Sequence, residues 1–114
     1  MLSFRDEQVR ALGGAVLTVF KKTLAAEIEA QHSMTSEEAT KIAQLGADHS
    51  VGYGLASPSE IRRYVALMFV LGKRFDADDA HPWAAFILEH PQLLPSVKLD
   101  LLEAKARAVA TPAP

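Results

Sequence analysis

The segment from Ser57 to Gly72 constrains the fold more than any other part of this sequence. It opens with Ser-Pro-Ser-Glu at residues 57–60, which offers a helix cap, a proline for the first helical position and a glutamate at the third. Residues 64–71 are all apolar, and Gly72 can take the left-handed conformation that ends helices. A helix with no polar side must be surrounded by other elements. The segment therefore predicts a buried central helix, with residues 64–71 as the most buried stretch.

A long helix is expected before it, from about Phe4 to Gln31, because Ser3 and Asp6 resemble a capping box. Apolar residues at spacings of three and four give this helix one face: Val9, Leu12, Val16, Phe20, Leu24 and Ile28. Leu17 and Val19 widen the face to about half of the circumference, at 100° per residue. A narrow bundle seam uses less than that. Some of Leu17, Val19 and Phe20 are therefore expected to face outward or to be covered by a second copy.

Three more helices follow from similar signals. A capping box at residues 35–38 opens a helix that ends before Gly54, Pro82 starts a short helix that ends before Pro91, and Pro95 opens the last one. The expected core residues of the last two helices are Trp83, Phe86, Ile87 and Leu88, then Val97, Leu99, Leu101, Leu102, Ala106 and Val109. Residues 73–81 show no helical period, and residues 111–114 are expected to be a disordered tail. The prediction is an all-α, compact five-helix bundle in one domain, residues 1–110.

Composition excludes several classes of function. A chain of 114 residues suits one domain, and 49% apolar with 23% charged residues is ordinary globular composition. A formal net charge of −2 argues against a dedicated nucleic-acid binder. The absence of cysteine excludes disulfides and thiolate zinc sites. Neither a signal peptide nor a membrane-spanning run of about 20 apolar residues is visible, so a cytoplasmic protein that does not bind membranes is expected.

The acidic segment at residues 76–79 is the strongest candidate in the sequence for a functional site, since clustered carboxylates can bind a hard cation. A calcium loop of the EF-hand type counted from Asp76 needs glycine at its sixth position and glutamate at its twelfth. Those positions hold histidine and isoleucine. The favoured interpretation is that Asp78 and Asp79 cap and charge the next helix. A metal-dependent enzyme built on Asp76, Asp78 and His81 stays an alternative.

Other catalytic patterns are missing from the sequence. It has no thiol, no Gly-x-Ser-x-Gly nucleophile elbow and no His-Glu-x-x-His string. The histidines are scattered, with no pair at the i, i+4 spacing of a helical metal site: His32, His49, His81 and His90. The sequence therefore predicts no enzyme, no cofactor, no metal and no catalytic residue.

Basic residues gather near the ends of the expected central helix. Arg62 and Arg63 suit its solvated start, whereas Lys73 and Arg74 suit its C-terminal end, where cations complement the helix dipole. Lys73 and Arg74 are also candidates for docking an acidic partner. Together with Leu17, Val19 and Phe20 they form the predicted partner-binding set.

The second half of the chain resembles small helical bacterial proteins that are often encoded beside type VI secretion spike and toxin genes. The resemblance covers roughly residues 46–102 and is carried by Tyr53-Gly54, Glu60, Tyr64, Leu67-Met68-Phe69, Leu71-Gly72, Phe75-Asp76, Pro82-Trp83-Ala84, Ile87-Leu88 and Lys98-Leu99-Asp100. It implies an adaptor or chaperone for a secreted effector, or alternatively an immunity protein that inhibits a cognate toxin. The expected partner is such a protein, or a second copy of this chain in a homodimer.

Overall fold

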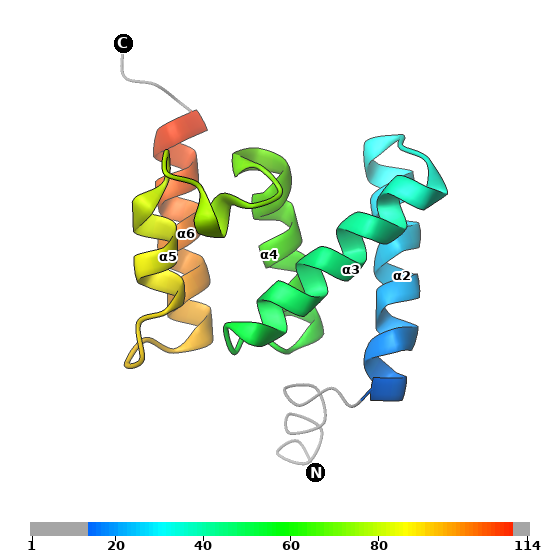
Figure 1. The fold of residues 1–114 in the computed structure, drawn as a ribbon, viewed down its shortest axis with the longest axis horizontal. Helices are drawn as coiled ribbons and strands as arrows, with labels where there is room; N and C mark the ends of the chain where they lie inside the picture. Colours follow the sequence, from blue (N-terminus) through cyan, green and yellow to red (C-terminus); the bar gives the residue numbers. More distant parts are fainter. Residues whose placement is uncertain (1–13, 111–114) are drawn as a thin grey trace. The chain divides into compact units, whose positions relative to one another are not determined.

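The structure is a computed structural model that describes residues 14–110, and it is all-α within that range (Figure 1). The described α-helices are α2 (Gly14–His32), α3 (Ser36–Gly52), α4 (Pro58–Leu71), α5 (Pro82–Leu88) and α6 (Pro95–Ala110). A 3-10 helix, η1 (Phe75–Ala77), lies between α4 and α5. Five helices and no strand in this part of the chain confirm the predicted fold class. The predicted cap at Ser3 and Asp6 and the tail at residues 111–114 lie outside the described residues.

The chain divides into two compact units, residues 1–65 and 66–114, and the boundary falls inside α4. Each unit is described by itself. The single domain expected from the sequence stays a prediction. None of the described helices is both long enough and apolar enough to cross a membrane.

The first unit is built on the packing of α2 against α3 (Figure 1). The α3 helix begins at the predicted capping box: the Thr35 hydroxyl accepts from the Glu38 backbone N–H at 3.1 Å, and the Glu38 carboxylate accepts from the Thr35 backbone N–H at 3.4 Å. Mostly small residues form the buried side of α3: Ala39, Ile42, Ala43, Gly46, Ala47 and Ser50. Small side chains let two helix axes approach closely.

A tight turn joins α3 to α4. Gly54 has φ +86°, the left-handed conformation that the sequence predicts there. The buried Ser50 hydroxyl donates to the Leu55 carbonyl at 2.5 Å, which fixes the turn from the inside. The second capping box is confirmed as well. The Ser57 hydroxyl accepts from the Glu60 N–H at 3.2 Å, and the Glu60 carboxylate accepts from the Ser57 N–H at 3.1 Å.

The apolar run at residues 64–71 is less uniformly buried than the sequence suggests. Tyr64, Val65, Leu67, Met68 and Leu71 are buried. Ala66 and Val70, which are four residues apart and so share one side of α4, are exposed, with Val70 at 56%. The run closes at Gly72, whose φ of +117° confirms the predicted helix end. The α4 helix thus has one side at the surface even though every residue in the run is apolar.

In the second unit α5 packs against η1 and α6 (Figure 1). Ala84, Ile87 and Leu88 of α5 are buried, as are Leu99, Leu102 and Ala106 of α6. The nearly buried Lys98 donates from Nζ to the Leu88 carbonyl at 2.7 Å. This bond satisfies a carbonyl at the end of α5 that has no partner within its own helix.

Three residues of α5 and α6 that the sequence assigns to the core lie at the surface instead. Phe86 is 71% exposed, Leu101 is 41% exposed and Val97 is exposed as well. Trp83 is only half-buried, with its ring 5.4 Å from that of His81. The reason is the helical period: in a helix that buries residues 84, 87 and 88, residue 86 points the opposite way. The side chain of Val109, also expected in the core, is not among those that the structure describes.

Candidate protein-docking surface

The α2 helix has three distinct sides. Phe20, Leu24 and Ile28 form a buried side. A second side faces α3, where the Lys21 ammonium contacts the Asp48 carboxylate at 2.6 Å. The third side is exposed to solvent.

We call the third side the α2 stripe and define it by its five exposed residues, which follow spacings of three and four: Val16, Val19, Thr23, Ala26 and Ala30. Val19 is 64% exposed and Val16 is 57% exposed. Lys22 is the only charged residue among the exposed side chains of residues 16–31. Helix sides that face solvent normally carry several charges. The α2 stripe is therefore unusually apolar for a solvent-facing surface.

One edge of the α2 stripe is fixed by α4. The Arg62 side chain donates to the Glu27 carboxylate through two bonds, Nε to Oε1 at 3.0 Å and Nη2 to Oε2 at 3.1 Å. The guanidinium carbon also lies 5.1 Å from the centre of the Phe20 ring, a cation–π arrangement. Glu27 and Phe20 are therefore held by Arg62 along this edge.

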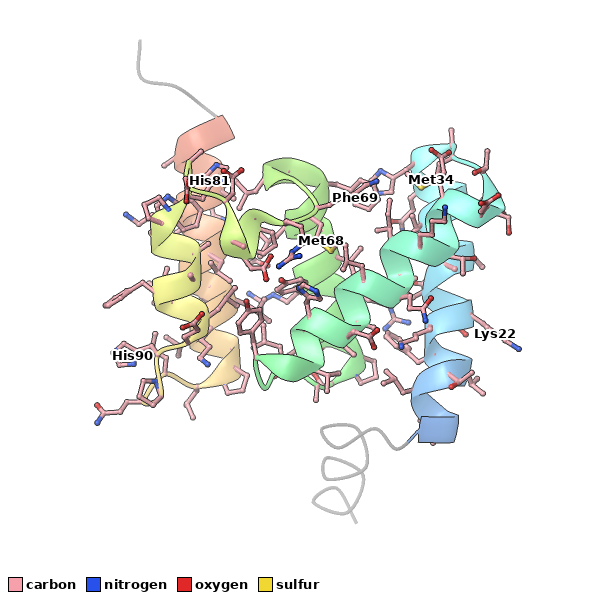
Figure 2. The ribbon with its side chains drawn as sticks, in the orientation of Figure 1. Lys22, Met34, Met68, Phe69, His81 and His90 are labelled. Atoms are coloured by element: carbon pink, nitrogen blue, oxygen red, sulfur yellow. The ribbon has the colours of Figure 1, made fainter. Side chains whose placement is uncertain are left out.

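The other edge borders a hollow of about 220 Å³ between α2 and α3. Thr18, Lys21, Lys22, Ala25, Thr40 and Gln44 line it. Two of its polar groups are already engaged, because Lys21 contacts Asp48 and the Thr40 hydroxyl donates to the Ser36 carbonyl at 2.8 Å. Figure 2 shows the Lys22 side chain extending away from the α2 ribbon. Lys22 thus lies between the stripe and the hollow as an accessible cation.

The predicted partner-binding residues differ in exposure and belong to different units. Val19 is exposed, Leu17 is half-buried, and Phe20 is buried at 9% exposure and belongs to the core of the first unit. Lys73 and Arg74 are exposed but belong to the second unit. Of the predicted set, Val19, Lys73 and Arg74 are exposed, and only Val19 lies on the α2 stripe.

Arg74 has a structural contact of its own. Its Nε donates to the Asp76 carboxylate at 3.2 Å, and the Asp76 side chain is only 2% exposed. A nearly buried carboxylate is stabilised by an opposite charge at this distance. Arg74 therefore balances Asp76 and is a weaker docking candidate than the sequence indicates.

The acidic segment does not cap α5. The N-cap residue is His81, and it makes no side-chain capping bond. The Asp78 carboxylate instead accepts from the Ala80 N–H at 2.9 Å and lies 3.6 Å from His81 Nδ1. Asp78 thus closes a turn of its own, as aspartate does when its side chain bonds two residues ahead. The interpretation of Asp78 and Asp79 as helix caps is corrected accordingly.

No metal centre is formed by the residues the structure describes. Nowhere between residues 14 and 110 do three histidine, aspartate or glutamate side chains come together closely enough to hold an ion. His81 and His90 lie at opposite ends of α5 (Figure 2). Asp76 is engaged by Arg74, and Asp78 is engaged by the Ala80 N–H. The prediction that the chain is not an enzyme stays a prediction.

Sequence reasoning missed Thr23, Ala26, Ala30 and Lys22. Threonine and alanine do not stand out when large apolar residues are counted, and Lys22 looks like any surface lysine. The sequence does contain a pattern that indicates these residues of α2. It is a second series at spacings of three and four, which starts at Val16 and contains none of the buried residues.

Comparison with known proteins adds no relative: no protein-family model matches the chain, no curated protein matches it, and no solved structure matches its fold.

Proposed function

We propose that this chain is a non-enzymatic accessory protein that binds another protein through the α2 stripe. The observation that carries the proposal is that α2 turns five apolar or small residues toward solvent, with Lys22 as the one exposed charged side chain among residues 16–31. An apolar side that a helix does not use for its own core is typical of a docking site.

The chemistry of the stripe favours a helix as the docked element. Residues at alternating spacings of three and four form the ridge that a second helix packs against. The side chains of Thr23, Ala26 and Ala30 are small, so a second helix can approach closely. The partner segment is then an amphipathic helix whose apolar residues cover Val16 and Val19.

The charges at the two edges define the partner further. Glu27 is engaged by Arg62 on one edge, while Lys22 is accessible on the other. A carboxylate next to the apolar side of the partner helix would meet Lys22 at the mouth of the hollow between α2 and α3. The proposed partner segment is therefore apolar on one side and acidic at its border.

The resemblance of residues 46–102 to proteins encoded beside type VI secretion genes supports the role of adaptor or chaperone for a bacterial secreted effector. An immunity protein that inhibits a toxin is the alternative. The two roles differ in consequence, because an adaptor leaves the activity of its bound effector intact and an immunity protein abolishes it.

The test uses the full chain as bait in lysate of its native host, followed by purification of the captured protein and measurement of its affinity by calorimetry. Val19→Lys is expected to weaken binding at least about tenfold, equivalent to about 1.4 kcal/mol, and to leave the melting temperature nearly unchanged. Lys22→Glu is expected to weaken binding in low salt and to have a smaller effect in high salt.

Lys41→Glu is the matched control, because Lys41 is exposed on α3 away from the stripe and is also a surface lysine. It should bind as wild type does. Equal affinity of the wild type and Val19→Lys for the purified partner would show that the partner docks elsewhere. Activity of the captured protein, measured with and without this chain, separates the adaptor from the immunity protein.

A further inference from the structure

The hollow of about 220 Å³ between α2 and α3 lies wholly within the first unit. Four of its lining residues come from one side of α2, and two residues one turn apart come from α3. Two of the six are lysines, and none of the six is an aspartate or a glutamate. The lining of the hollow therefore contributes cations and no carboxylate.

Lys21 is the better fixed of the two cations. Its ammonium lies 2.6 Å from the Asp48 carboxylate, and its side chain is only 22% exposed. An ammonium has three N–H donors, so the bond to Asp48 leaves two of them for another acceptor. Asp48 itself is not among the residues that line the hollow. Lys21 is therefore held beside the hollow in a defined position, which lowers the entropic cost of binding an anion there.

Lys22 and Gln44 supply the other donors. Both are exposed, one on each helix, and the Gln44 amide can donate two hydrogen bonds. The Lys22 side chain extends away from the ribbon (Figure 2), and its flexible four-carbon stem allows the ammonium to turn toward a ligand. Two lysines against the single carboxylate of Asp48 leave a net positive charge at this place. This chemistry favours an anion that accepts several hydrogen bonds at once.

The volume of the hollow limits the size of its ligand. At about 30 Å³ per molecule, a hollow of 220 Å³ holds about seven waters. Pockets for drug-sized ligands measure about 300–1,000 Å³, so the ligand of this hollow is smaller than those. Ala25 is half-buried and is the one lining residue without a polar side chain. An anionic group on a short carbon chain fits both the volume and the lining.

We propose that the hollow between α2 and α3 binds a small molecule with a phosphate or carboxylate group through Lys21, Lys22 and Gln44. Lys21 and Gln44 hold the anionic group from the two helices, and Lys22 turns to close over it. The site needs no partner protein, so it goes beyond the proposed function. The ligand and an acidic partner then compete for Lys22, and this consequence alone rests on the proposed function.

Titration of the full chain with inorganic phosphate and, separately, with succinate tests the proposal. Binding is followed by ¹H–¹⁵N nuclear magnetic resonance at constant ionic strength, which keeps the screening of the lysines the same throughout. The backbone amides of Lys21, Lys22 and Gln44 should shift and saturate with a Kd of about 1 mM, because the hollow is open and offers few donors. The probe that binds more tightly identifies the anionic group, phosphate or carboxylate.

Two variants separate a shaped site from the mere attraction of anions to lysines. Ala25→Leu fills the hollow but keeps both ammonium groups, and it should weaken binding at least about tenfold. Gln44→Leu fills the hollow from an exposed position of α3 and removes an amide donor, so it should weaken binding to a similar extent. Gln44→Leu decides the question if Ala25→Leu melts far below the wild type.

Charge removal completes the test. Lys22→Gln should weaken binding about tenfold. Lys41→Gln is the matched control, because Lys41 is an exposed lysine of α3 that does not line the hollow, and it should bind as wild type does. None of these titrations includes a partner protein, so their failure leaves the proposed function untouched. Shifts that do not saturate below about 10 mM of either probe, a Gln44→Leu variant that binds as tightly as wild type, or equal losses in Lys22→Gln and Lys41→Gln would overturn the proposal.

Discussion

The helices α2 and α3 pack on each other in the same unit, yet they meet solvent in opposite ways. The exposed side of α3 carries Glu37, Glu38, Lys41 and Asp48, whereas the exposed side of α2 carries Lys22 alone among residues 16–31. Both helices bury one side, so burial does not explain the difference. The comparison teaches that the apolar residues of α2 exceed what its own packing needs, and that the excess lies on one side.

The two helices also differ in their inner sides. Large side chains form the buried side of α2, and mostly small ones form that of α3. A contact between large and small side chains lets the two helices lie close together. The core of this unit therefore depends more on the few large residues of α2 than on any single residue of α3.

The largest expected effect comes from the inner side of α2. Leu24→Asp should unfold the first unit, because Leu24 is 2% exposed and an uncompensated charge in its place costs several kcal/mol, against a total stability of about 5–15 kcal/mol. Far-ultraviolet circular dichroism and urea titration measure this. Val19→Asp is the matched change on the α2 stripe. Its free energy of unfolding should lie within about 0.5 kcal/mol of that of the wild type. Similar stability of the two variants would remove the distinction between the two sides.

A smaller effect is expected at the start of α3. Thr35→Ala removes the capping box and should cost about 1 kcal/mol, which is a fall of about 4–8 °C in melting temperature for a domain of this size. Ser36→Ala, one residue later, is the control, because the capping bonds come from Thr35 and Glu38. Differential scanning calorimetry resolves a difference of this size. Equal losses in both variants would mean that the box does not stabilise α3.

The smallest effect concerns the ion pair that joins the two helices. Lys21 and Asp48 are 2.6 Å apart and partly exposed, so their coupling should be about 0.2–1 kcal/mol. A double-mutant cycle with Lys21→Met and Asp48→Asn measures it. The coupling should shrink in 1 M salt, where charges are screened within about 3 Å. The more exposed Glu37–Lys41 pair, confined to α3, should couple less. The reverse order would contradict the role of Lys21 as a tie between α2 and α3.

The sequence predicts the helices well because their boundaries are set locally. Two capping boxes, three prolines at first helical positions, and glycines at 54 and 72 each act within a few residues of the chain. Chemistry of this kind is visible without knowing what packs where. The 3-10 turn η1 was not predicted, because it has no capping bond and only three residues.

Burial was predicted less well, because an apolar pattern does not distinguish a core from an exposed side. Phe86, Val70 and Leu101 are as apolar as their buried neighbours, but they lie on sides of their helices that no other helix covers. The same ambiguity affects the proposed docking surface. Val19 was singled out because it widened an apolar face, whereas Ala26 and Ala30 carry too little apolar surface to be noticed.

Lys98 has a consequence for chemical labelling. The chain has six lysines, and the ammonium of Lys98 is the one that donates to the last turn of α5 from a nearly buried position. An amine must be accessible and deprotonated to be acylated, so Lys98 reacts only when α5 and α6 separate. The labelling rate of this single residue reports the opening of that contact in an otherwise intact molecule. It is read by mass spectrometry against that of the exposed Lys105, seven residues further along α6.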